Sequence, residues 1–85
     1  MIEHSLKTWP SWFAALRTGA KTAEVRLNDR DFKVGDRLIL EEWDPDTGYT
    51  GRTEERTISH IMGDNHPGLW SGYVLLSFAP RKEAP

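Results

Sequence analysis

The stretch from Gly19 to Arg37 constrains the fold of this 85-residue chain more than any other. Gly19 follows a helical pattern and suits the left-handed position that ends many helices. Residues 22–27 then alternate apolar and polar side chains, which predicts a strand, and Gly35-Asp36 predicts a turn into another strand. We expect the many charges of this stretch to pair with one another or to bind a ligand. Together with Arg17 just before it, the stretch carries these charged side chains: Lys21, Glu24, Arg26, Asp29, Arg30, Asp31, Lys33, Asp36 and Arg37.

The pattern of apolar residues predicts one helix and five strands. Trp9, Trp12, Phe13 and Leu16 recur at i, i+3, i+4 and i+7, which predicts a helix up to about Thr18 that packs on a sheet. Because most connections are short, we expect largely antiparallel pairing. The predicted fold class is α+β and mainly β: a small β-barrel of about five strands, partly closed, with one helix packed across an opening. The strands are expected at residues 2–7, 22–27, 37–43, 50 or 53 to 62, and 73–79.

Length and composition limit the class of protein. A chain of 85 residues suggests one domain, expected at 1–80, with a disordered tail at 81–85. The absence of cysteine excludes disulfides and thiolate metal sites, and three scattered histidines lack ligand spacing, so we expect neither metal nor cofactor. No apolar run is long enough to cross a bilayer. We therefore expect a soluble, cytoplasmic protein.

The net charge of −2 is unevenly distributed along the chain. Residues 17–37 carry a net charge of +2, whereas residues 38–64 carry −5. A protein that binds a polyanion with its whole surface would be basic throughout. This distribution excludes that class and leaves a local cleft for a nucleotide or a short single strand.

Strand parity sorts the charges of residues 22–27. Ala23, Val25 and Leu27 are expected to face the core, and Glu24 and Arg26 to face outward. With Lys21 at the preceding junction, these two charged side chains can converge in a cleft between the helix and the strand. An arginine fork grips a carboxylate, phosphate or base edge, and a carboxylate accepts a hydrogen bond from a base amine. A plain surface ion pair remains the alternative reading of the same residue types.

Several other positions carry expectations about packing. His4 lies between apolar residues and is expected to be half-buried with a hydrogen-bond partner. Phe32 and Val34 are expected to anchor the polar loop that follows the second strand. Glu42 is expected to face inward, either bonding Arg26 or Arg30 behind the cleft or ending its strand in solvent.

The motif Gly19-x-Lys21-x-x-Glu24-x-Arg26, with Val34-Gly35-Asp36-x-Leu38 after it, resembles the signature of the ASCH domain. That family belongs to the PUA-like superfamily of small β-barrels. Two further segments, Asn28-Asp29-Arg30-x-Phe32 and Gly48-Tyr49-Thr50-Gly51, resemble a short bacterial and phage branch of unknown function. The resemblance covers roughly residues 4–78.

The resemblance implies a cleft for RNA, a nucleoside or a nucleotide, lined by Lys21, Glu24 and Arg26. Lys7, Asn28 and Arg30 are the further candidate ligand contacts. Trp9 or Trp12 would add a stacking face if exposed, and would otherwise belong to the core.

Two alternatives stay open. Some ASCH relatives are amidohydrolases that deacetylate N4-acetylcytidine, and that chemistry is attributed to a lysine, a threonine nucleophile and a later glutamate. Lys21 matches the lysine, but Glu24 occupies the threonine position, which removes the acyl-enzyme route; a Lys21/Glu24 pair would have to activate water instead. The second alternative is a non-catalytic domain that binds another protein through its acidic hairpin.

Overall fold

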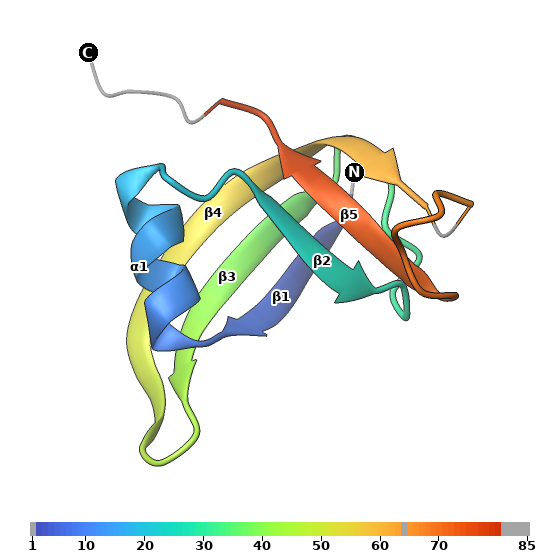
Figure 1. Ribbon diagram of the computed structural model, residues 1–85. Helices are drawn as coiled ribbons and strands as arrows, with labels where there is room; N and C mark the ends of the chain where they lie inside the picture. Colours follow the sequence, from blue (N-terminus) through green and yellow to red (C-terminus); the bar gives the residue numbers. More distant parts are fainter. Residues whose placement is uncertain (1, 64, 81–85) are drawn as a thin grey trace.

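The computed structural model describes residues 2–63 and 65–80, which form one helix and five strands (Figure 1). The expected tail at 81–85 lies outside the described residues. No helix in the described part of the chain is both long and apolar enough to cross a membrane. The elements are β1 (Glu3–Thr8), α1 (Pro10–Thr18), β2 (Ala23–Leu27), β3 (Arg37–Asp44), β4 (Gly48–Met62) and β5 (Tyr73–Phe78).

The strands form one mixed sheet in the order β1-β3-β4-β5-β2. Three of its four pairings are antiparallel, as expected, but β1 and β3 run parallel. A parallel pair needs a long crossover, and here α1 and β2 lie between the two strands in the chain. The α+β, mainly β class is confirmed. The ladder leaves β1 and β2 as edges, so a closed barrel is not confirmed.

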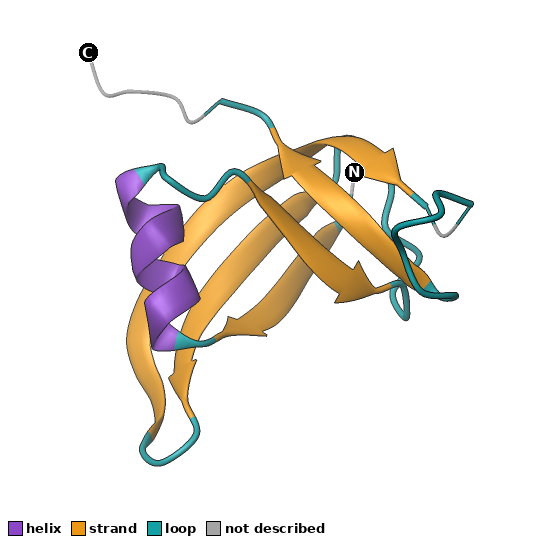
Figure 2. Ribbon diagram, in the orientation of Figure 1, coloured by secondary structure: helices purple, strands orange, loops and turns teal. Residues whose placement is uncertain are grey.

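The long strand β4 lets the sheet curl. Its first part pairs with β3 and its last part, from Ile58, pairs with β5. The register shifts between Ile58 and His60, and such a bulge bends a strand and increases its twist. Figure 2 shows the result: β2 and β5 lie across from β1 and β3.

The helix α1 packs against β3 and β4 and buries Phe13 and Leu16. The outer part of the predicted stripe does not pack on the sheet, since Trp9 and Trp12 are about half-exposed. The hydrophobic core consists of buried aliphatic and aromatic side chains. Its buried members are Leu6, Leu16, Phe32, Leu38, Leu40, Ile58, Val74, Leu76 and Phe78.

Both ends of α1 follow the sequence pattern. Pro10 occupies the first turn, where its missing N–H costs nothing. Gly19 ends the helix with φ of 87°, a left-handed conformation that glycine adopts readily. The buried Arg56 of β4 then donates through Nη2 to the carbonyl of Leu16 at 2.6 Å, which ties the end of the helix to the sheet.

The predicted orientation of β2 is wrong. Glu24 is 5% exposed, whereas Val25 and Leu27 are 54% and 48% exposed. In the ladder, Glu24 lies opposite Leu76 and Arg26 opposite Val74, so both charged side chains share the face that carries the core. A carboxylate tolerates this position because cations and hydrogen bonds compensate its loss of water.

The loop after β2 departs from expectation at one residue. Phe32 is buried in the core, as predicted, but Val34 is exposed. Gly35, with φ of 96°, turns the chain directly after it. Of the two predicted apolar anchors, only Phe32 therefore packs into the core.

Candidate functional site

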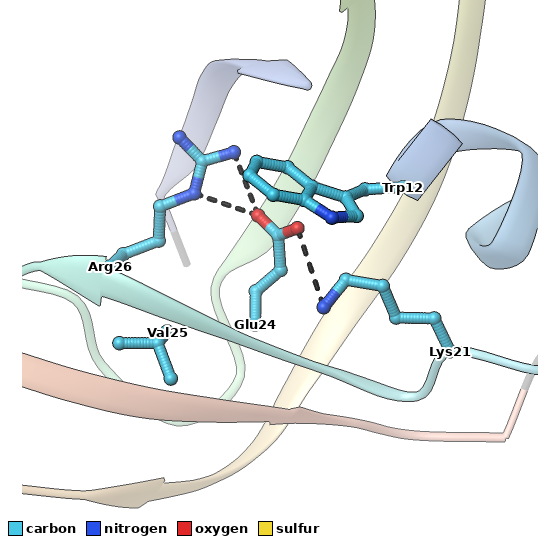
Figure 3. Close-up of a pocket in the computed structure, with 5 residues that line it drawn as sticks. All are labelled: Trp12, Lys21, Glu24, Val25 and Arg26. Atoms are coloured by element: carbon cyan, nitrogen blue, oxygen red, sulfur yellow. Dashed lines mark hydrogen bonds and ion pairs between the residues drawn. The ribbon is translucent and has the colours of Figure 1, made fainter. Parts of the chain in front are cut away.

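Glu24 stands at the centre of a cluster of three charged side chains (Figure 3). Its Oε2 accepts a hydrogen bond from Nε of Arg26 at 2.7 Å and forms an ion pair with Nη2 of Arg26, also at 2.7 Å. Its Oε1 lies 3.7 Å from Nζ of Lys21, an ion pair longer than a hydrogen bond. The cluster therefore holds a buried carboxylate between two cations.

The turn after α1 positions Lys21. Its backbone N–H donates to the carbonyl of Ala15 at 3.0 Å, so the residue stays attached to the last turn of the helix. Its Nζ donates to the carbonyl of Ala23 at 2.6 Å, which directs the ammonium toward Glu24. The glycine stop and the following strand thus place the lysine where the sequence pattern expected it.

Arginine side chains bridge the two edges of the sheet. Arg26 Nη2 donates to the carbonyl of Lys7 at 2.6 Å and to Oγ1 of the buried Thr8 at 3.4 Å. Arg30 Nη1 donates to the carbonyl of Ser5, two residues earlier on the same edge. Guanidinium groups therefore connect β2 and its following loop to β1, where the ladder has no strand pairing.

A pocket of about 340 Å³ opens beside this cluster and is lined by Trp12, Lys21, Glu24, Val25 and Arg26. Its volume is at the lower end for small-molecule sites. The 54% exposed indole of Trp12 forms its apolar wall and stacks on Trp9, with ring centroids 5.8 Å apart and planes at 24°. One aromatic face and three charged groups thus surround a single hollow.

The pocket retains hydrogen-bonding capacity for a ligand. Glu24 Oε1 is beyond hydrogen-bond length from Lys21 and can accept from a ligand N–H. Arg26 uses Nε and Nη2 for protein contacts, and its Nη1 has no partner among the described residues. The residues that line the pocket therefore keep one acceptor, Glu24 Oε1, and one donor group, Arg26 Nη1, for a ligand.

Three predicted ligand contacts lie outside the residues that line this pocket. Asn28 uses Oδ1 to accept from the backbone N–H of Phe32 at 3.1 Å, which shapes the loop. Arg30 holds the edge of β1, as described above. The exposed Lys7 lies with Nζ 4.6 Å from the ring centroid of Trp43, a cation–π contact with the end of β3.

Glu42 is buried at the end of β3, as its parity predicted, but it serves the hairpin. Its Oε1 accepts from Thr50 Oγ1 at 2.7 Å and lies 3.5 Å from Nε of Arg52. The hypothesis that it bonds Arg26 or Arg30 behind the cleft is wrong.

The sequence analysis missed the role of Asp36. His4 has a hydrogen-bond partner, as predicted, but is more fully buried than expected, and its Nε2 lies 2.9 Å from Oδ2 of Asp36. Asp36 also accepts from the backbone N–H groups of Ile2 and Lys33, both at 3.1 Å. The hydrogen bond from His4 is the main reason that the pKa of Asp36 lies below its ordinary value. Among the residues that the structure describes, no group of three His, Asp or Glu side chains is arranged to hold a metal ion.

Comparison with known proteins connects the chain to phage. It is 38% identical over 58 residues to an uncharacterized 12.9 kDa protein in the GpA 3′ region of Escherichia phage P2. The match covers 68% of this chain and 52% of the phage protein, so the chain spans about half the length of that relative. Residues 3–78, nearly all of the described chain, match a domain of unknown function, DUF3850. The protein therefore belongs to the DUF3850 family.

Proposed function

We propose that this DUF3850 protein binds a nucleobase, free in a nucleoside or nucleotide or within single-stranded RNA, in the pocket between α1 and β2. The observation that carries the proposal is the convergence of Lys21, Glu24 and Arg26 beside the exposed ring of Trp12. Aromatic side chains stack on any base. The charged groups would add recognition of the base edge.

The donor and acceptor pattern favours particular bases. Glu24 Oε1 would accept from an exocyclic amine, and Arg26 Nη1 or Lys21 Nζ would donate to a neighbouring ring nitrogen or carbonyl oxygen. Cytosine and adenine present an amine beside an acceptor, whereas uracil has no amine. One bidentate contact discriminates by about 1–3 kcal/mol. Cytidine and adenosine should therefore bind about 5- to 150-fold more tightly than uridine.

The resemblance to ASCH domains supports the same pocket. The residues of the resembling motif, Lys21, Glu24 and Arg26, are the ones that meet there. We also propose that the fold is PUA-like, and that the contacts of Arg26 and Arg30 with β1 stand in for the missing strand pairing of a barrel seam. A cytoplasmic location, where such a domain meets RNA, is part of the same proposal.

Calorimetric titration with the four nucleosides and with short single-stranded RNA tests the function. Lys21→Ala removes a charged contact and should weaken binding about tenfold or more. Trp12→Ala should weaken it through lost stacking. Lys33→Ala is the matched control, because Lys33 is an exposed lysine paired only with the exposed Asp31 in the described structure. Equal affinity of wild type and Lys21→Ala, or no binding of any of these ligands, would refute the proposal.

One observation favours a second candidate, hydrolysis of an acylated nucleoside. Lys21 Nζ and Glu24 Oε1 lie 3.7 Å apart in the same pocket. Glu24 would take a proton from a water molecule while that water attacks the acyl carbon. Lys21 would protonate the departing amine. None of the described residues that line the pocket carries a hydroxyl, so the route would use water directly. Incubation with N4-acetylcytidine should then release acetate, and Glu24→Gln should abolish the release.

A further inference from the structure

A second hollow of about 290 Å³ lies on the other face of β2. Its lining residues are Val25, Gly68, Leu69, Trp70 and Tyr73. None of them carries a charge, and Trp70 is 80% exposed. The proposed nucleobase pocket does not account for such an exposed indole.

The two pockets lie on opposite faces of β2 and share one lining residue. Val25 lies opposite Leu75, and Leu27 opposite Tyr73, so these side chains occupy the face opposite Glu24 and Arg26. Figure 3 shows Val25 pointing away from the charged cluster. Val25 nevertheless lines both hollows. The pockets are therefore neighbours across the width of a single edge strand.

Short backbone bonds shape the loop that carries Trp70. Tyr73 N–H donates to the carbonyl of Trp70 at 3.0 Å, and Leu69 N–H donates to that of His66 at 3.1 Å. The N–H of Asn28 donates to the carbonyl of Gly72 at 2.8 Å, which ties the loop to the end of β2. The Trp70 ring meets Tyr73 edge to face, with centroids 6.2 Å apart and planes at 84°. The indole thus has Tyr73 as an aromatic neighbour and leaves most of its surface open.

We propose that this second pocket binds a second nucleobase of the same single strand, adjoining the base held beside Glu24. The inference rests on the proposed function and extends it from one base to a path over β2. An uncharged aromatic hollow suits the stacking of a base without reading its edge. Because the two hollows share Val25, this hollow adjoins a pocket that carries two cations against one carboxylate, where the linking phosphate would be attracted. Trp12 and Trp70 would stack on bases at the two ends of this path.

The test compares cytidine monophosphate with the dinucleotide CpA by calorimetry. From the stacking energy of one base on an aromatic ring, CpA should bind about 5- to 150-fold more tightly. Trp70→Ala should remove this gain and leave the affinity for cytidine monophosphate unchanged, whereas Trp70→Phe should keep most of it. Tyr49→Ala is the matched control, because Tyr49 is an exposed aromatic residue outside both pockets.

The outcomes separate this inference from the proposed function. If cytidine monophosphate binds in a Lys21-dependent way but CpA binds no more tightly, the second subsite is refuted and the proposed function stands. If neither ligand binds, both are refuted. If Trp70→Ala leaves the affinity for CpA unchanged but abolishes self-association in sedimentation, the surface contacts a second copy and the inference is wrong.

Discussion

Replacing Arg26 with alanine should destabilise the fold as well as alter the pocket. The guanidinium bonds the buried Glu24 at 2.7 Å and the carbonyl of Lys7 at 2.6 Å, across the unpaired edges of the sheet. Arg26→Ala would remove both bonds and leave the Glu24 carboxylate with only the longer contact to Lys21. The structure therefore predicts that Arg26→Ala lowers the free energy of unfolding by more than the loss of a surface ion pair would.

The expected magnitude follows from burial. Removing one partner of a fully buried ion pair costs about 3–5 kcal/mol. The Arg26 side chain is 25% exposed, so water can partly replace it and the lower end applies. We expect a loss of about 3 kcal/mol in the free energy of unfolding. For a domain of this size the melting temperature should fall by about 10–25 °C.

Urea unfolding followed by tryptophan fluorescence measures this loss. Arg37→Ala is the control, because Arg37 pairs with the exposed Glu55 and such pairs contribute about 0–1 kcal/mol. A double-mutant cycle of Arg26→Ala with Glu24→Gln should give a coupling energy of about 1 kcal/mol or more. If Arg26→Ala costs no more than Arg37→Ala, or if the coupling energy is near zero, the inferred role of this bridge is wrong.

Two further predictions concern the framework of the fold. The pKa of Asp36 is lowered mainly by the hydrogen bond from His4. The ionised Asp36 should therefore contribute its full stabilisation of the fold above pH 3.8, the ordinary pKa of the group. This contribution should be lost as pH falls through the lower pKa of the folded state. Asp36→Asn should therefore flatten the acid limb of a pH–stability curve, whereas Asp46→Asn, in the exposed hairpin turn, should not. Arg56→Lys should lower the unfolding free energy by about 1–3 kcal/mol, because lysine lacks the guanidinium fork and loses the 2.6 Å bond to the helix end. An unchanged denaturation midpoint for Arg56→Lys would contradict that role.

Local patterns predicted the elements of the fold well. The glycine at the end of α1, the proline at its start and the alternation in the strands are signals that neighbouring residues create by themselves. These local patterns could not predict the order of the strands in the sheet. The parallel pairing of β1 with β3 depends on how α1 and β2 cross over, and no short pattern records that path.

The cluster of Lys21, Glu24 and Arg26 was predicted, but its orientation was not. Alternation indicated that Glu24 and Arg26 share one face of β2, and it could not indicate which face is buried. Apolar side chains at Val25 and Leu27 favoured the wrong choice. The charged face lies inward because Lys21 and the edge of β1 supply partners for its charges, and those partners come from other elements.

The sequence by itself determined the helix, the strands and the three charged residues of one motif, because spacing along the backbone sets those relations. Only the tertiary structure decided that Glu24 is buried, that Arg26 bridges β2 to β1, and that Trp12 and Trp70 are exposed on neighbouring pockets. Burial of a charge depends on partners distant in the chain, so its cost becomes acceptable only when the fold brings those partners together.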